Sequence, residues 1–123
     1  MGRENREIGE IGEQIALEFL KNKGYEPLGM NVRTPFGEID VVAMQKETTV
    51  FIEVKTRATS SLGPPYLNVT REKQMHLIRN ALCYLKRRGL VNSDWRIDVV
   101  SIKLNDRYEL ESSELIENAV EDG

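Results

Sequence analysis

The chain has 123 residues, of which 40% are hydrophobic and 30% are charged, and these values are typical of one globular domain with one core. Its single cysteine excludes an internal disulfide and predicts a cytoplasmic protein, while the absence of any long apolar run argues against a membrane protein. A formal net charge of −3 excludes a uniformly basic protein.

The first half of the chain predicts one helix and three strands. Residues 5–23 carry apolar side chains at helical spacing, and Gly24 stops the helix. Short apolar runs between turn residues predict strands at residues 27–34, 38–44 and 49–56. The turns at Thr34–Gly37 and Gln45–Thr48 would connect these strands into a meander.

The second half predicts one more helix and a buried strand. Residues 58–69 have the composition of a loop, and Thr70 is placed to cap a helix that runs to about Arg88. An almost continuous apolar run at Trp95–Leu104 predicts a strand that is buried on both faces. The last expected elements are a short strand at residues 107–110 and a weak helix at residues 113–120.

The order of these elements defines the expected fold. A helix, a three-strand meander, a helix and a strand predict an α/β domain in which helices flank a mixed sheet. We expect this single domain to span residues 1–104. Residues 105–123, which contain seven acidic residues and one arginine, are expected to form an acidic C-terminal extension.

Charged residues interrupt one face of two neighbouring strands. Side chains alternate between the faces of a strand, so the opposite face is apolar throughout and carries Ile39, Val41, Ala43, Val50, Ile52 and Val54. A hairpin centred on residues 46–47 would place Asp40 opposite Glu53, and Glu38 opposite Lys55. The sequence therefore predicts two carboxylates that face each other, with a lysine beside them.

Such a pair of carboxylates is typical of a cation site. Directly opposed strand residues have Cβ atoms about 4.5–5.5 Å apart, and two carboxylates at that distance repel unless a positive charge neutralises them. Mg²⁺ commonly binds one or two carboxylates and keeps water or phosphate oxygens as its other ligands. The alternative is a solvent-facing strand pair in which Glu38 simply pairs with Lys55.

Two helical residues could point toward the same place. Glu13 lies at the margin of the apolar stripe of the first helix, and Gln74 shares the stripe of the second helix near its start. Both have an ordinary interpretation as well, Glu13 as a surface carboxylate and Gln74 as a polar residue solvated at a helix end.

Five short motifs carry a family resemblance. They are Gly12-Glu13, Asn31-Val32-Arg33, Gly37-Glu38-Ile39-Asp40, Val50-Phe51-Ile52-Glu53-Val54-Lys55-Thr56-Arg57 and Lys73-Gln74. With these motifs the chain resembles the YraN-like family of small bacterial endonucleases over residues 9–104. That family is similar in fold to Holliday-junction resolvases and PD-(D/E)xK nucleases, so the resemblance implies a restriction-endonuclease-like fold. One departure is Ile39, which precedes Asp40 where the larger group has proline.

The resemblance implies a metal-dependent DNA endonuclease that hydrolyses phosphodiester bonds. It assigns Mg²⁺ or Mn²⁺ to Asp40, Glu53 and the backbone carbonyl of Val54, with Glu13 supporting this ion or a second one. Lys55 would position or activate water and stabilise charge on the phosphate. Asp40, Glu53, Lys55 and Glu13 are accordingly the expected catalytic residues.

DNA is the expected partner. Residues 70–89 contain six basic residues and one glutamate, although a solvated helix face would have the same composition. The expected DNA contacts are Arg33, Arg57, Lys73 and Gln74. No base-reading element is evident, which favours recognition of branched DNA or DNA ends in repair or recombination. The alternative is a nuclease-fold module that binds branched DNA or a repair partner without cutting, and the oligomeric state stays open, with a homodimer among the options.

Overall fold

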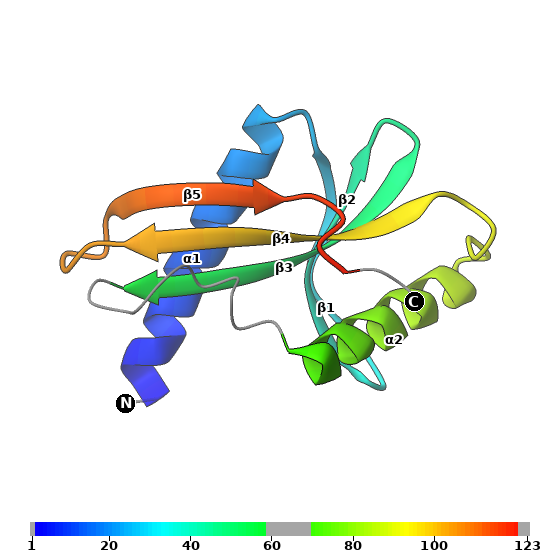
Figure 1. The fold of residues 1–123 in the computed structure, drawn as a ribbon, viewed down its shortest axis with the longest axis horizontal. Coiled ribbons are helices and arrows are strands. Elements are labelled where there is room, and N and C mark those ends of the chain that lie inside the picture. The colour runs from blue at the N-terminus through cyan, green and yellow to red at the C-terminus, as the bar shows by residue number, and fades with distance from the viewer. Residues whose placement is uncertain (1, 59–69, 121–123) are drawn as a thin grey trace.

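The structure is a computed structural model that describes residues 2–58 and 70–120. Its elements in chain order are α1 (Gly2–Asn22), β1 (Glu26–Thr34), β2 (Gly37–Gln45), β3 (Thr48–Ala58), α2 (Arg71–Arg87), β4 (Trp95–Leu104) and β5 (Leu110–Ile116) (Figure 1). The predicted order of helix, three strands, helix and strand is confirmed as far as β4. The loop predicted at residues 58–69 falls, beyond residue 58, outside the described part of the chain.

One mixed sheet carries the fold. Its strand order is β1-β2-β3-β4-β5, and every neighbouring pair is antiparallel except β3 and β4, which run parallel. The parallel pair is joined by the segment that contains α2, as a crossover connection requires. The chain is therefore an α/β domain with a mixed five-stranded sheet and two helices.

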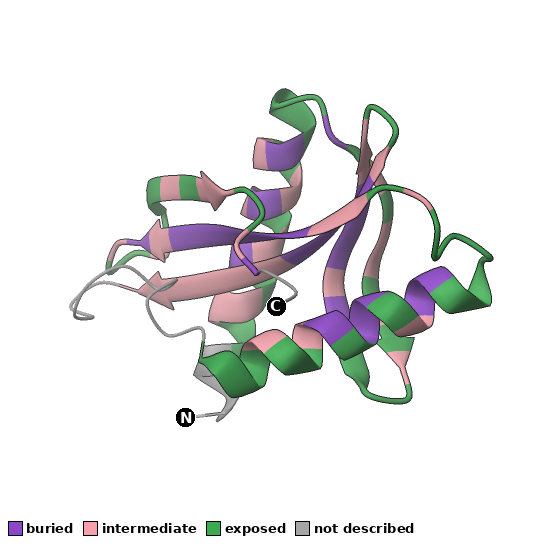
Figure 2. Ribbon diagram, turned by 45° about the vertical axis from the view of Figure 1, so that its right-hand side comes forward, coloured by how far each residue is buried: buried purple, intermediate pink, exposed green. Residues whose placement is uncertain are grey.

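The two helices cover opposite faces of the sheet. In Figure 1, α1 crosses behind the strands and α2 lies in front of β1 and β2. The cluster under α1 contains Ala16, Leu20, Val41, Val50, Ile52 and Val100, and the cluster under α2 contains Val42, Phe51, Ile78, Ala81, Leu85 and Ile97. Figure 2 shows the buried residues of α2 on its sheet-facing side and long buried stretches along the central strands. Alternating side chains of one strand thus enter two cores, as predicted for β4.

The capping residue of α2 is where the sequence places it. Thr70 has an extended backbone, and its hydroxyl accepts a hydrogen bond from the backbone N–H of Lys73 at 3.2 Å. This cap sets the direction in which α2 leaves the loop. It therefore sets which side chains of the first helical turns face β2 and β3.

The predicted face of Ile39 is wrong. Alternation groups Ile39 with Val41 and Ala43, which do pack under α1, but Ile39 belongs to the cluster under α2 together with Val42. The alternation is broken at Asp40, the point where the described pairing between β2 and β3 ends. Ile39 still pairs with Val32 of β1, so its change of face coincides with the separation of β2 from β3.

The helix predicted at residues 113–120 is also wrong. Leu110–Ile116 form strand β5, which pairs with β4 along the edge that β3 leaves open. Its Leu115 packs against the cluster under α1. Polar residues at 111–114 fit an edge strand, where charged and polar side chains discourage further pairing. The acidic stretch that follows residue 104 therefore contributes a strand to the sheet.

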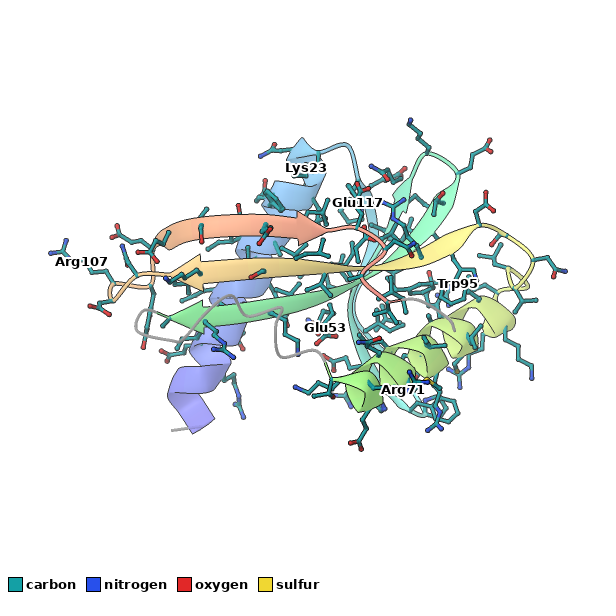
Figure 3. All side chains as sticks on the ribbon, in the orientation of Figure 1. Lys23, Glu53, Arg71, Trp95, Arg107 and Glu117 are labelled. Atoms are coloured by element: carbon teal, nitrogen blue, oxygen red, sulfur yellow. The ribbon has the colours of Figure 1, made fainter. Side chains whose placement is uncertain are left out.

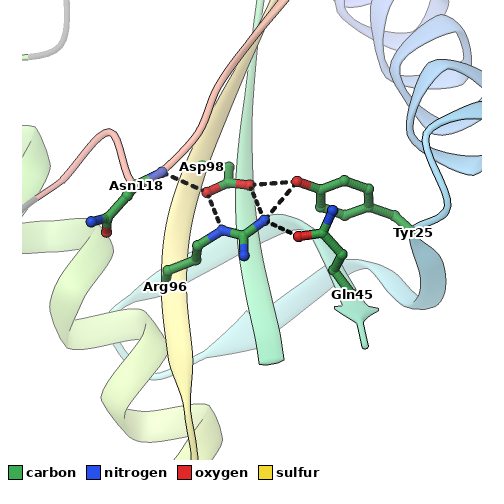
Figure 4. A network of polar contacts seen from close by, with 5 residues as sticks. All are labelled: Tyr25, Gln45, Arg96, Asp98 and Asn118. Atoms are coloured by element: carbon green, nitrogen blue, oxygen red, sulfur yellow. Dashed lines mark hydrogen bonds and ion pairs between the residues drawn. The ribbon is translucent and has the colours of Figure 1, made fainter. Parts of the chain in front are cut away.

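A buried polar network ties four segments together at the end of β2 remote from Asp40 (Figure 4). The carboxylate of Asp98 is fully buried and accepts hydrogen bonds from Arg96 Nε at 3.0 Å, from the Tyr25 hydroxyl at 3.0 Å and from the Asn118 backbone N–H at 2.8 Å. Arg96 also donates to Gln45 Oε1 at 2.6 Å. Both oxygens of Asp98 have partners within the fold, so this network links the segments that carry Tyr25, Gln45, Arg96 and Asn118.

Candidate functional site

A pocket of about 990 Å³ opens between the sheet and the N-terminal half of α2. Figure 3 shows Glu53 on the side of the sheet that faces α2, with Arg71 at the start of that helix. The charged residues that line the pocket are four carboxylates and three cations, namely Glu38, Asp40, Glu53, Glu72, Lys55, Lys73 and Arg79. The structure therefore brings Asp40, Glu53 and Lys55 together in one cavity, as the sequence predicts.

The register between β2 and β3 is the predicted one, but it ends before the carboxylates. The pairs run from Gln45–Thr48 to Val41–Ile52. Beyond them, Asp40 Oδ2 accepts a hydrogen bond from the Val54 backbone N–H at 2.8 Å. The predicted cross-strand pairs of Asp40 with Glu53 and of Glu38 with Lys55 are therefore not ladder pairs.

Ion pairs at the site also differ from the prediction. Lys55 Nζ lies 3.6 Å from Glu53 Oε1, on its own strand, whereas Glu38 lies 3.9 Å from the exposed Arg33. The interpretation as a simple Glu38–Lys55 surface pair is thus excluded. Lys55 instead compensates Glu53 and Asp40, two half-buried carboxylates.

Burial, together with a neighbouring carboxylate, raises the pKa of both Asp40 and Glu53. The Glu53 side chain is only 19% exposed, and burial, followed by the nearby Asp40 charge, raises the pKa of Glu53 to about 7. Burial likewise raises the pKa of Asp40, although the Val54 N–H and Lys55 oppose the change. The nearby lysines, Lys55 and Lys73, thus do not offset the cost of burial at Glu53, and an additional cation would favour the ionised form of both carboxylates.

Close packing of α1 on β3 brings Glu13 to the same site. A Cβ atom at Gly12 would lie 2.7 Å from the Thr56 Cβ atom, so only glycine allows the helix to approach the strand this closely. The next residue, Glu13, is half-buried, and its pKa is raised by burial and then by the charge of Asp40. Glu13 thus reaches the edge of the carboxylate site, as expected from its place on the helix.

Asn31 is a site residue that the sequence reasoning missed. Its amide, oriented to satisfy its neighbours, donates to Glu13 Oε1 at 3.2 Å and to Glu38 Oε1 at 3.0 Å. The backbone at Asn31 has φ 50°, a left-handed conformation that asparagine tolerates better than most residues. An asparagine inside a strand, where this residue type is depleted, was the available indication.

The residues fit a site for an ion such as Mg²⁺, which takes few protein ligands, better than a metal site formed entirely by protein ligands. Within residues 2–58 and 70–120, no three histidine, cysteine, aspartate or glutamate side chains are arranged as a preformed ligand set. Mg²⁺ needs only one or two carboxylates from the protein, since water and substrate phosphate supply its other ligands. Asp40 and Glu53 meet that requirement, and the Asp40 hydrogen bond holds the Val54 backbone beside them.

The expected DNA-binding residues are only partly brought together. Lys73 lines the pocket, and its charge lowers the pKa of Glu53 against the effect of burial. Arg33 has an 88% exposed side chain beside Glu38. Arg57 and Gln74 are half-buried and are not among the residues that line the pocket in the described ranges. Arg79 and His76, which were not predicted, do line it.

Comparison with known proteins gives one family. The profile described as "Uncharacterised protein family UPF0102" matches residues 12–102. A "UPF0102 protein" of Desulfosudis oleivorans is 44% identical over 119 residues, which cover 97% of this chain and 94% of that protein. A protein of the same name from Alkaliphilus oremlandii is 45% identical over 81% of this chain and 87% of its own length. Another, from Caldicellulosiruptor saccharolyticus, is 43% identical over 93% of this chain and 97% of its own length.

These matches confirm the family resemblance seen in the five sequence motifs. The matched region includes Glu13, Asp40, Glu53 and Lys55, together with the N-terminal half of α2.

A separate finding concerns membranes: none of the helices described here is long and apolar enough to cross one.

Proposed function

We propose that this chain, which belongs to the UPF0102 family, is a metal-dependent deoxyribonuclease that hydrolyses phosphodiester bonds in the cytoplasm. One observation carries the proposal: Asp40 and Glu53 are half-buried in one pocket beneath the basic helix α2, and Lys55 Nζ lies 3.6 Å from Glu53 Oε1. Buried like charges are retained at a cost in stability, and functional sites are where such arrangements concentrate.

The proposed metal is Mg²⁺ or Mn²⁺. Asp40, Glu53 and the Val54 backbone carbonyl would hold it, because oxygen ligands of this kind suit hard divalent cations. When bound, such an ion supplies Lewis acidity at the phosphoryl oxygen and lowers the pKa of its water ligand. Glu13 would support the same ion or a second one from α1, and Asn31 would keep the Glu13 carboxylate oriented through its hydrogen bond at 3.2 Å.

The remaining charged groups act on the phosphate. Lys55 can donate to a phosphate oxygen or to the attacking water, because it lies between the carboxylates and the open pocket. Lys73 and Arg79 line the same pocket from α2 and are placed to bind the DNA backbone on either side of the scissile bond. These contacts hold phosphates in place and carry no sequence information.

The proposed substrate is branched DNA or DNA ends, in repair or recombination. Backbone contacts without a base-reading element favour recognition of DNA structure over recognition of sequence. A second candidate is a module that binds such DNA without cutting it. This candidate is favoured by the lack of a preformed three-ligand metal set among the residues that the structure describes.

A cleavage assay separates the two functions. Purified protein should cut linear, flapped or four-way-junction DNA in Mg²⁺ or Mn²⁺ and not in EDTA. Asp40→Asn should abolish cutting, because the asparagine oxygen can still accept the Val54 hydrogen bond while the charge is lost. Glu47→Gln, at the exposed β2–β3 turn, is the matched control and should cut normally. DNA binding without cutting by the wild type would establish the binding module instead.

A further inference from the structure

The turn between β1 and β2 presents an aromatic ring beside the pocket. Phe36 is 48% exposed, although large apolar residues are usually buried. In Figure 1 this turn lies beside α2, and an added Cβ at Gly37 would come within 2.7 Å of His76 Nε2. His76 lines the pocket together with Asp40 and Glu53, so the ring is a near neighbour of the proposed catalytic site.

The turn is held rigidly. The Phe36 backbone N–H donates to Thr34 Oγ1 at 3.0 Å, and the Thr34 hydroxyl donates in turn to Asn80 Oδ1 of α2. Gly37 has φ 144°, a conformation that side chains rarely adopt, and it leaves no room for a Cβ against His76. The backbone that carries Phe36 is therefore held in place, so that little backbone entropy is lost when a ligand covers the ring.

One cation lies on β1 just before the turn, and another lies on the part of α2 that the turn contacts. Arg33 precedes the turn with an 88% exposed side chain, and Arg79 faces the pocket one turn of α2 away from His76. A single exposed phenylalanine needs no explanation by itself. Proteins bind single-stranded nucleic acid with aromatic rings accompanied by cations, because phosphates pair with the cations and bases stack on the rings.

We propose that Phe36 stacks on an unpaired base, so that the substrate is DNA with unpaired bases close to the cleavage point. The inference rests on the proposed nuclease function and deepens it by naming the substrate structure. Phe36 lies in the turn directly before β2 and four residues before Asp40, which is at most about 13 Å at about 3.3 Å per residue. That length corresponds to about four nucleotides of a stacked strand, at about 3.4 Å per nucleotide.

The test measures binding by fluorescence anisotropy in EDTA, where no cleavage occurs. The full-length protein is titrated with a paired duplex and with the same duplex carrying an unpaired fork. The wild type should bind the fork more tightly. Phe36→Ala should weaken binding to the fork at least about fivefold and leave the paired duplex unchanged, whereas Phe36→Trp should retain the preference. Leu28→Ala removes an equally exposed side chain (51%) from the other end of β1 and should change neither affinity.

The outcomes separate the inference from the proposed function. Equal weakening on both DNAs, or no weakening, would overturn the stacking role while leaving the nuclease proposal standing. Wild-type protein that neither binds DNA in EDTA nor cuts it in Mg²⁺ would overturn both. In Mg²⁺, the cut in a forked duplex should lie about four nucleotides from the fork, and a cut at a clearly different spacing would contradict the placement of the ring.

Discussion

Replacing Glu53 by glutamine should stabilise the metal-free protein, and by an amount that depends on pH. The substitution keeps the size of the side chain and removes its charge. In the folded protein that charge is disfavoured by burial and by Asp40, which together raise the pKa of Glu53 from 4.5 to about 7. The ionised carboxylate is therefore a destabilising group at neutral pH.

The sign and size of the effect follow from linkage. Between pH 4.5 and 7, Glu53 is protonated in the folded protein but ionised in the unfolded chain. Because the folded state binds the extra proton, the free energy of unfolding falls as pH rises through this range. A change from 4.5 to about 7 corresponds to about 3 kcal/mol. Glu53→Gln should match the wild type near pH 4 and exceed it by up to about 3 kcal/mol at pH 8.

Urea denaturation of both proteins in EDTA at pH 4.5, 6 and 8 measures this difference directly. Glu47→Gln also removes one negative charge, from the exposed β2–β3 turn, and should show no pH-dependent gain. A constant difference between Glu53→Gln and the wild type at all three pH values would refute the reasoning. So would a variant that is less stable at pH 8, because Glu53 would then make a stabilising contact in its charged form.

Two further predictions concern packing and the buried network. Gly12→Ala should lower the free energy of unfolding, measured by thermal denaturation, by about 1–3 kcal/mol, because the added Cβ would meet Thr56. Gly9→Ala is the control: its added Cβ would have nothing within 4 Å, so this variant should be as stable as the wild type or slightly more stable. Arg96→Ala should cost about 3–5 kcal/mol, since it leaves the Asp98 carboxylate buried without its cation. Cleavage by the folded fraction of Arg96→Ala should be unchanged, and a stable but inactive variant would contradict a purely structural role.

Several features of the fold could be predicted from the sequence because local physical constraints determine them. The register of β2 and β3 follows from one short turn and from the requirement that apolar residues share a face. Thr70 caps α2 as its residue type favours, and β4 begins and ends where its apolar run does. These constraints also brought Asp40, Glu53 and Lys55 into one pocket.

Other features depend on contacts between distant segments and were missed. The side chain of Ile39 changes face where β2 leaves β3 at Asp40, and no local pattern marks that separation. β5 lacks the alternation of apolar and polar residues that predicts a strand, because it is an edge strand. Its place in the sheet depends on hydrogen bonding to the free edge of β4. Asn31 of β1 hydrogen-bonds to Glu13 of α1, and the Asn31 backbone is left-handed. Strand periodicity indicates neither the contact nor this backbone conformation.

The central claim is that Asp40 and Glu53 hold one divalent cation, and calorimetric titration with Mn²⁺ in two buffers of different ionisation enthalpy tests it most directly. With the Glu53 pKa at about 7, binding at pH 6 should release close to one proton, and binding at pH 8.5 almost none. Glu53→Gln should lose this binding site. Binding of equal strength in Glu53→Gln, or binding at pH 6 without proton release, would show that the ion binds elsewhere and would contradict the account.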